Sequence, residues 1–227
     1  MRFSIDLVLT TLLLISCNNT SEKATADPAS NETQTTAEKI ATAYGIENWK
    51  RVEKLEFTFN VDRGERHFER SFQWFPKQNK VVYMNETDTV SYFRDQPMDS
   101  IVRAADKRFI NDTYWMLSPF KLVWDEGTTL IDSTDVVAAV AKDTLNKLTI
   151  VYGQEGGYTP GDAYDFYYDD AYTVKEWVYR PQNTAKAATA TLWGGLETYN
   201  GIKIATQHTD TTGNFRLYFS NISVSGD

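Results

Sequence analysis

The stretch KLEFTFNV, residues 54–61, decides the fold class of this chain. Its apolar residues alternate with polar ones, and a period of two is typical of a β-strand with one buried face. We therefore expect the apolar set to point into a core and the polar set to point outward. The inward set is Leu55, Phe57, Phe59 and Val61, and the outward set is Glu56, Thr58 and Asn60.

Segments with the same strand character follow in two groups, on either side of one helical stretch. Turn signals separate them, among them the Asn200-Gly201 pair, which favours a tight hairpin. The segments are 67–75, 80–85 and 89–93 before the helical stretch, and 146–152, 163–170, 173–180, 188–211 and 215–224 after it. Because strands joined by tight turns pair antiparallel, the sequence predicts a mainly β (α+β) fold with an antiparallel sheet of about nine to eleven strands.

Two stretches have helical character. Residues 36–45 begin with a cap residue and end with Gly45, which predicts a short helix. After Asp99, apolar residues recur at helical spacing, which predicts a second helix that ends near Asn111.

The stretch TYWMLSPFKLVW, residues 113–124, follows this second helix. It is too rich in large apolar residues for an exposed loop. Pro119 argues against a continuing regular element, because proline removes a backbone donor. We expect the chain to turn back towards the sheet here.

The N-terminus carries the one cysteine of the chain, Cys17, directly after an apolar run at 7–15. This run is too short for a membrane span of ~20 residues, but it fits the apolar region of a secretory signal. Residues 14–17, Leu-Ile-Ser-Cys, resemble the lipobox of bacterial lipoproteins. The resemblance implies a signal peptide at 1–16 and an acylated Cys17. A plain signal peptide and a buried free thiol are the alternatives.

Between the cysteine and the strands lies a segment without aromatic residues, rich in Ser, Thr, Asn, Ala and Glu. Such a composition cannot bury enough apolar area to offset chain entropy. We therefore expect residues 17–36 to comprise the lipidated cysteine and a flexible tether, and residues 37–227 to form one β domain.

The net charge of −8 and the pI near 4.9 limit the partners. An acidic chain without a Lys/Arg cluster argues against nucleic acid. It also argues against electrostatic attraction to an anionic membrane, so the N-terminal lipid anchor would supply membrane attachment. We expect a monomer.

The segment NDTYWMLSPFKL at 111–122, together with the order of elements, resembles the superfamily of periplasmic lipoprotein carriers and sorting proteins (LolA/LolB-like). More narrowly, the chain is similar to uncharacterised lipoproteins of Bacteroidetes-type bacteria. The resemblance covers about residues 37–225. It implies a curved antiparallel half-barrel with one or two helices over an apolar concave face that binds acyl chains. The basic residues that control release in characterised carriers have no matching positions here.

The composition fits such a cavity, with 6 Trp, 13 Tyr and 12 Phe, but it fits the packed core of a closed β domain as well. If the cavity exists, we expect the apolar stretch after the helix to form its wall or lid, together with strand residues. The candidates are Tyr114, Trp115, Leu117, Phe120, Leu122, Phe57, Phe59 and Trp74.

No catalytic signature is present in the sequence. His67 and His208 both fall in strand patterns, where we expect them on polar faces. No HxxxH, HExxH or CxxC spacing, Gly-x-Ser-x-Gly elbow or phosphate-binding loop occurs. We therefore predict no catalytic residue, metal site or cofactor.

Clustered carboxylates follow the glycine-rich loop 153–161 and could hold Ca²⁺. Their spacing does not match an EF-hand, and we expect a solvated hairpin instead. These residues are Asp162, Asp165, Asp169 and Asp170.

Three functions remain open. The first is a non-catalytic lipoprotein of the bacterial envelope, in the outer membrane and facing the periplasm or the cell surface, which binds a lipid or other hydrophobic ligand. The second is an envelope hydrolase with scattered carboxylate and Tyr site residues. The third is a purely structural envelope lipoprotein. An open apolar cavity would favour the first, and two converging acids near a His would favour the second.

Overall fold

The computed structural model describes residues 34–155 and 159–227 of the 227-residue chain. Residues Gln34–Asp227 group together by their contacts, and every element named below belongs to this unit. The expected signal peptide, Cys17 and nearly all of the expected tether lie outside the described residues. In the described part of the chain, no helix is both long and apolar enough to span a membrane.

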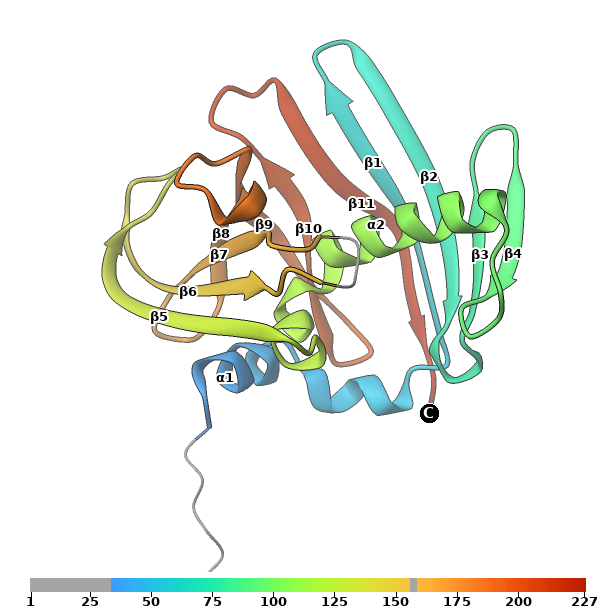
Figure 1. The fold of residues 1–227 in the computed structure, drawn as a ribbon, viewed down its shortest axis with the longest axis horizontal. Helices are drawn as coiled ribbons and strands as arrows, with labels where there is room; N and C mark the ends of the chain where they lie inside the picture. The colour runs from blue at the N-terminus through green and yellow to red at the C-terminus, as the bar shows by residue number, and fades with distance from the viewer. Residues whose placement is uncertain (1–33, 156–158) are drawn as a thin grey trace, which may run out of the picture. The chain divides into compact units, whose positions relative to one another are not determined.

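Eleven antiparallel strands form one curved sheet that stays open (Figure 1). The strand order is β4-β3-β2-β1-β11-β10-β9-β8-β7-β6-β5. The strands are β1 (Lys54–Arg63), β2 (Arg66–Phe75), β3 (Lys80–Met84), β4 (Thr89–Phe93), β5 (Thr128–Val137), β6 (Thr144–Tyr152), β7 (Ala163–Tyr168), β8 (Val174–Arg180), β9 (Thr189–Tyr199), β10 (Ile202–Thr209) and β11 (Phe215–Ser225). This confirms the predicted mainly β fold and its strand number.

Two meanders make up the sheet, and they meet where β1 pairs with β11. The first meander runs from β1 to β4 and the second from β5 to β11, so the first and last strands are neighbours. The connection between the meanders is the long helix α2 (Ser100–Trp124), which crosses the concave face of the sheet (Figure 1). The two groups of strands expected from the sequence correspond to these two meanders, except that β5 (Thr128–Val137) was not expected.

Strand β1 follows its predicted alternation on one face only. Leu55, Phe57 and Phe59 are buried, as expected. Thr58 and Asn60 were expected to point into solvent, but they are buried as well.

Neighbouring strands explain the burial of these two polar residues. The hydroxyl of Thr58 lies 2.8 Å from that of Ser71 on β2. The Asn60 amide donates to the Thr58 carbonyl and to the Ser220 hydroxyl on β11, each at 3.0 Å. The neighbouring strands β2 and β11 thus cover these small polar side chains and supply their hydrogen-bond partners.

The short helix α1 (Thr36–Ala43) forms where the sequence predicts it, with Thr35 rather than Thr36 as its N-cap. A capping box fixes this end, because Thr35 and Glu38 bond to each other's backbone N–H groups. A 3₁₀ turn, η1 (Ile46–Arg51), leads on to β1. Two further 3₁₀ turns, η2 (Pro76–Gln78) and η3 (Pro181–Asn183), follow β2 and β8.

The prediction that the mid-chain helix ends near Asn111 is wrong. Helix α2 continues through the apolar stretch 113–124, with a kink at Leu117. Pro119 cannot donate to the carbonyl four residues earlier, and the kink accommodates this loss. The Ser118 hydroxyl donates to the carbonyl of Tyr114 next to it. Burial of the stretch against the sheet therefore outweighs the helix-breaking tendency of one proline.

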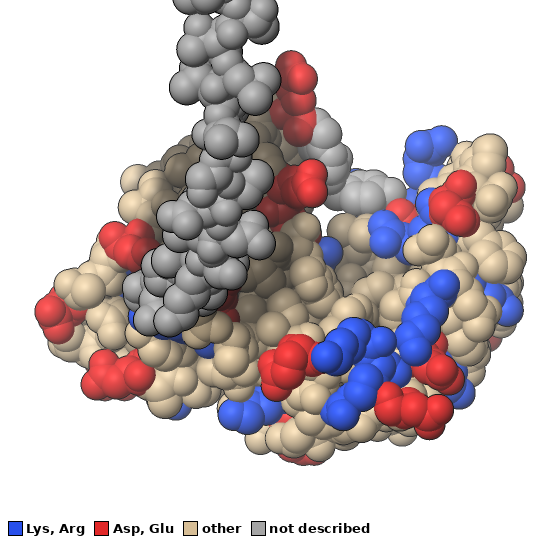
Figure 2. All heavy atoms as spheres, turned by 90° about the horizontal axis from the view of Figure 1, so that it is seen from below, with Lys and Arg blue, Asp and Glu red and all other residues tan. Residues whose placement is uncertain are grey.

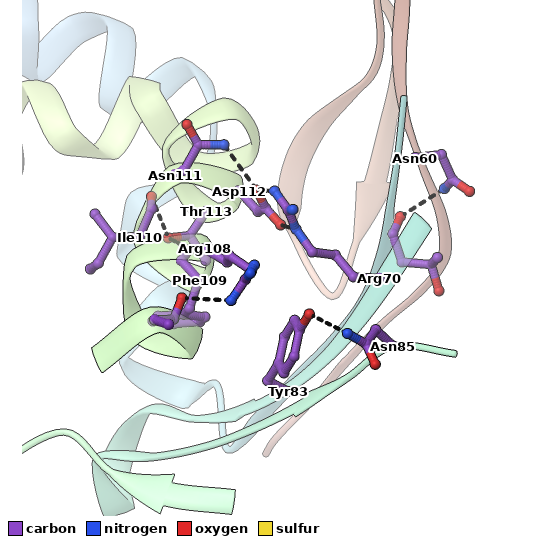
Figure 3. Close-up of polar contacts among 12 residues, drawn as sticks. Asn60, Arg70, Tyr83, Asn85, Arg108, Phe109, Ile110, Asn111, Asp112 and Thr113 are labelled. Carbon is purple, nitrogen blue, oxygen red and sulfur yellow. Dashed lines mark hydrogen bonds and ion pairs between the residues drawn. The ribbon is translucent and has the colours of Figure 1, made fainter. Parts of the chain in front are cut away.

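Two buried carboxylates hold α2 against the first meander. Asp112 receives two hydrogen bonds from Arg70 on β2, at 2.6 and 2.7 Å (Figure 3). Asp106 receives one from Arg94, directly after β4, at 2.9 Å. Burial raises the pKa of Asp112, and the Arg70 guanidinium opposes that shift. Buried charges persist in a fold when they are paired in this way.

Aromatic side chains fill the space between α2, η1 and the strands β1 to β3. Phe57 and Phe72 stack with ring centroids 5.2 Å apart, and Phe109 of α2 lies 5.8 Å from Phe72. We call this region the packed half of the concave face. Its ring-contacting members are Trp49, Phe57, Phe72, Trp74, Phe109 and Phe120.

Candidate functional site

A cavity of about 910 Å³ opens on the concave side of the sheet, along α2. Both meanders, α2 and the segment after it contribute to its lining. We call this region the open half of the concave face. Its lining includes Phe59, Val61, Arg63, Ile110, Tyr114, Trp115, Trp124, Tyr152, Tyr164, Trp177, Tyr179, Phe215 and Leu217.

One wall of the cavity is a stack of aromatic rings from β7 and β8. Tyr164 stacks against Trp177 at 5.2 Å and against Tyr179 at 5.1 Å. From α2, Trp115 approaches Trp177 to 4.2 Å between ring centroids and Tyr114 approaches Tyr164 to 4.6 Å. Rings that pack on one another in this way form a rigid apolar surface, which can bind a hydrophobic ligand with little loss of side-chain entropy.

A short chain of hydrogen bonds joins three lining residues of the cavity near the C-terminal end of α2. The Tyr152 hydroxyl donates to Asp125 at 2.7 Å and lies 3.0 Å from the Tyr114 hydroxyl. Since a phenol has one proton, Tyr152 accepts from Tyr114. Burial, with the neighbouring Asp125 charge, raises the pKa of Tyr152 above its usual range. Both phenols therefore stay neutral, as hydrogen-bonding parts of an otherwise apolar wall.

The structure places some of the residues expected at a cavity in its lining and others elsewhere. Tyr114, Trp115 and Phe59 line the cavity. The remaining five, three from α2 near its kink and two from β1 and β2, lie in the packed half or next to it. These are Leu117, Phe120, Leu122 and Phe57, which are buried, and Trp74, which is partly buried against Trp49 and Phe109.

Sequence reasoning missed most of the aromatic wall. Trp177 and Tyr179 are two residues apart on β8, so strand alternation alone could have placed both side chains on one face. Tyr164 gave no such signal, because every residue of β7 is buried and no alternation exists there.

His208 is buried completely, which corrects the expectation that it lies on a polar face. It contacts the rings of Trp193, Trp115 and Phe219, with centroids 4.9, 5.3 and 5.9 Å away. Neither ring nitrogen makes a hydrogen bond to the described residues. Burial lowers the pKa of His208 to about 3, against a smaller opposing effect of the Ala205 backbone. The imidazole is therefore neutral near pH 7.

His67 is exposed, as expected, and bonds to Asp62 at 2.7 Å and Glu69 at 3.3 Å. These two carboxylates raise the pKa of His67. Neither histidine belongs to the cavity lining.

Of the four carboxylates after the glycine-rich loop, Asp169 and Asp170 lie in the accessible turn between β7 and β8, as expected, but the other two do not. Asp162 and Asp165 are buried. Asp165 accepts from Thr149 at 2.6 Å and from Arg180 at 2.8 Å, and Asp162 accepts from the Tyr179 hydroxyl at 2.8 Å. Their oxygens thus hold β6, β7 and β8 together. Among the described residues, no group of three His, Cys, Asp or Glu side chains is placed to hold a metal ion.

No protein family and no curated protein matches the chain. Two similar solved structures are a DUF1329 family protein from Desulfovibrio piger ATCC 29098 and a LolA superfamily protein from Nitrosomonas europaea. The first has a TM-score of 0.48 and 9% identity, over 85% of this chain and 94% of that one. The second has a TM-score of 0.49 and 8% identity, over 86% and 96%. Likeness at this level establishes neither family membership nor function.

Proposed function

We propose that the domain binds a lipid or another hydrophobic ligand in the open half of its concave face and performs no catalysis. The observation that carries this proposal is the cavity of about 910 Å³ with its stacked aromatic wall. Ligand pockets in proteins commonly measure roughly 300–1,000 Å³ and are lined mainly by apolar and aromatic side chains. The cavity falls in this size range, and apolar or aromatic side chains make up about half of its lining, with charged residues among the rest.

The polar groups near the cavity support binding rather than hydrolysis. General acid–base catalysis needs a titratable group within hydrogen-bond reach of the substrate. His208 is enclosed by aromatic rings, and Asp125 at the cavity wall already accepts from Tyr152. Glu126 and Glu155 also line the cavity, but neither histidine does, so its acids are not combined with an imidazole as a hydrolase site would need. This favours the ligand-binding function.

The proposed location is the bacterial envelope, with Cys17 as the lipid anchor, and it rests on the N-terminal sequence alone. The surface charge is consistent with a need for such an anchor. On the face shown in Figure 2, acidic and basic side chains are interspersed, and the chain as a whole carries −8. Mixed charges on an acidic protein give weak attraction to an anionic bilayer, so an acylated cysteine would provide the attachment.

Tryptophan fluorescence tests the proposed function. We would titrate the full chain carrying Cys17→Ser, which lacks the acylation site, with decanoate and with a short-chain phospholipid. Because Trp115, Trp124 and Trp177 line the cavity, we expect a saturable shift that Trp115→Phe reduces. The matched control Trp74→Phe, whose indole packs against Trp49 and Phe109 instead, should keep the shift. A flat titration with both ligands would contradict the proposal and leave a structural role.

A further inference from the structure

The tip of the β1–β2 hairpin carries two arginines that face each other. Arg63 ends β1, Arg66 begins β2, and the two are directly opposite in the strand register. Like charges directly opposite each other on paired strands destabilise a sheet. A favourable interaction elsewhere would explain why two guanidinium groups occupy this position.

Neither guanidinium has a charged partner among the described residues. In residues 34–155 and 159–227, no ion pair or hydrogen bond involves the side chain of Arg63 or Arg66. The Arg63 guanidinium lies 5.3 Å from the ring centroid of Phe215, on β11. Nearby Arg70 differs, because Asp112 binds it with two hydrogen bonds. The hairpin tip therefore offers two uncompensated cations, and one of them has a defined place over an aromatic ring.

An exposed aromatic residue lies on the same face of the hairpin. Phe68 is 58% exposed and pairs in register with Val61. Together with both arginines, these residues line a second hollow of about 510 Å³, whose lining also includes Glu69, bonded to His67 at 3.3 Å. An aromatic side chain beside arginines in a hollow is a combination found at binding sites.

This second hollow is continuous with the main cavity. Phe59, Val61, Arg63 and Arg70 belong to the lining of both. Along the concave face of the hairpin, Phe57 and Phe72 are followed by Phe59 and Arg70, then by Val61 and Phe68, and at the tip by Arg63 and Arg66. Asp112 neutralises Arg70, so the uncompensated positive charge lies at the tip. A molecule that lies along this face meets apolar side chains inside and positive charge at the mouth.

We propose that the ligand of the cavity is an amphiphile with an anionic head group, bound by Arg63 and Arg66, and with an apolar chain that lies along the aromatic wall. This inference rests on the proposed function and names the class of ligand. The head group that the two arginines bind is a carboxylate or a phosphate, since guanidinium groups form charge-assisted hydrogen bonds with both.

The charges at the other end of the cavity favour the same orientation. Asp125, Glu126 and Glu155 belong to the lining near the C-terminal end of α2 and after β6. In Figure 1 this end of α2 lies away from the tip of the β1–β2 hairpin. Lys121 also lines this end and pairs with Asp125 at 3.3 Å, which leaves Glu126 and Glu155 as its uncompensated charges. These two carboxylates disfavour an anionic head group there, so the orientation with the head group at the hairpin tip is the more favourable one.

Calorimetric titration of the full chain carrying Cys17→Ser tests this proposal. The probes are decanoate, decyl phosphate and decanol, which share one chain length and differ in the head group. We expect both anions to bind about tenfold more tightly than decanol at low ionic strength, since two solvent-exposed charge contacts add about 1.4 kcal/mol together. The ratio between decanoate and decyl phosphate then shows which anion the site prefers.

The double variant Arg63→Gln/Arg66→Gln should lose this tenfold preference and bind decanol as before. A matched control, Lys50→Gln/Lys186→Gln, removes two exposed positive charges that do not line the cavity, and it should keep the preference. Equal affinity of the unsubstituted chain for decanol and both anions would overturn the inference, as would an undiminished preference in the arginine variant. Failure of all three probes to bind would instead overturn the proposed function.

Discussion

The packed half and the open half of the concave face are both rich in aromatic side chains, but only the packed half is filled by them. Phe57 and Phe59 are neighbours on the same face of β1, yet Phe57 packs against Phe72, whereas Phe59 belongs to the cavity lining. The difference arises from α2, whose Phe109 packs directly on Phe72 in the packed half, whereas its Tyr114 and Trp115 pack on β7 and β8 and leave the cavity between them and Phe59. Alternation along a strand thus shows which face is apolar, and the path of the helix decides whether that face becomes core or cavity.

The largest expected effect comes from truncating two aromatic residues of β2, Phe72 in the packed half and Phe68 beside the open half, opposite Val61. Phe72→Ala should reduce the free energy of unfolding by about 3–5 kcal/mol, because it leaves a void beneath Phe57 and Phe109. Phe68→Ala, on the same strand and face but 58% exposed, should change it by less than about 0.5 kcal/mol. Urea denaturation measures both. Equal losses would mean that the open half is packed as well.

The ion pair between β2 and α2 is expected to have the next largest effect, because it holds the helix in place over the packed half. Asp112→Asn should cost about 3 kcal/mol, since it leaves Arg70 partly buried without its counter-charge. The control Lys77→Gln breaks the exposed pair with Glu53, at 3.6 Å, and should cost less than about 0.5 kcal/mol. If thermal or urea unfolding found the two variants equally stable, α2 would not depend on this contact.

The buried histidine makes the second meander sensitive to acid. The pKa of His208 in the fold, about 3, lies below the ordinary value of 6.5, so the unfolded chain binds the proton first as pH falls. Its contribution to stability is constant above about pH 6.5 and is lost between there and pH 3. By pH 4 this loss amounts to roughly 3 kcal/mol.

Comparison of the two histidines isolates this effect. His208→Gln should remove that part of the acid destabilisation in urea titrations at pH 7 and pH 4. His67→Gln is the control, because Asp62 and Glu69 raise the pKa of His67, and the stability it contributes is present below 6.5 and lost at higher pH. The His67 variant should therefore keep the acid destabilisation of the unsubstituted chain. An unchanged pH dependence in His208→Gln would show that the imidazole is accessible to water.

Much of the fold could be predicted because it depends on local patterns. The alternation in 54–61 and the Asn200-Gly201 turn each specify a strand or a hairpin within a few residues. The course of the chain at Pro119 could not be predicted, because the burial that keeps the segment helical comes from a sheet remote in sequence. The same holds for Thr58 and Asn60, whose partners Ser71 and Ser220 lie on neighbouring strands.

The candidate site was less predictable than the fold. Trp115 and Tyr114 were expected at the cavity because a strongly apolar stretch must be covered, and that argument needs no tertiary detail. The same argument could not distinguish Trp115 and Tyr114 from the buried Phe120 and Leu122, since only the kink at Leu117 turns the latter two side chains into the core. The opposition of Arg63 and Arg66 depends on strand register, which the hairpin turn fixes only once the two strands are paired.

Native mass spectrometry of the protein extracted from its host envelope tests most directly whether the open half is a ligand cavity. We expect an added mass that dissociates as a lipid or another hydrophobic molecule. Ile110→Trp, which fills the cavity from α2, should lose that mass, whereas Val123→Trp, on the same helix but outside the lining, should retain it. An unsubstituted chain without added mass, or equal occupancy in both variants, would contradict the account.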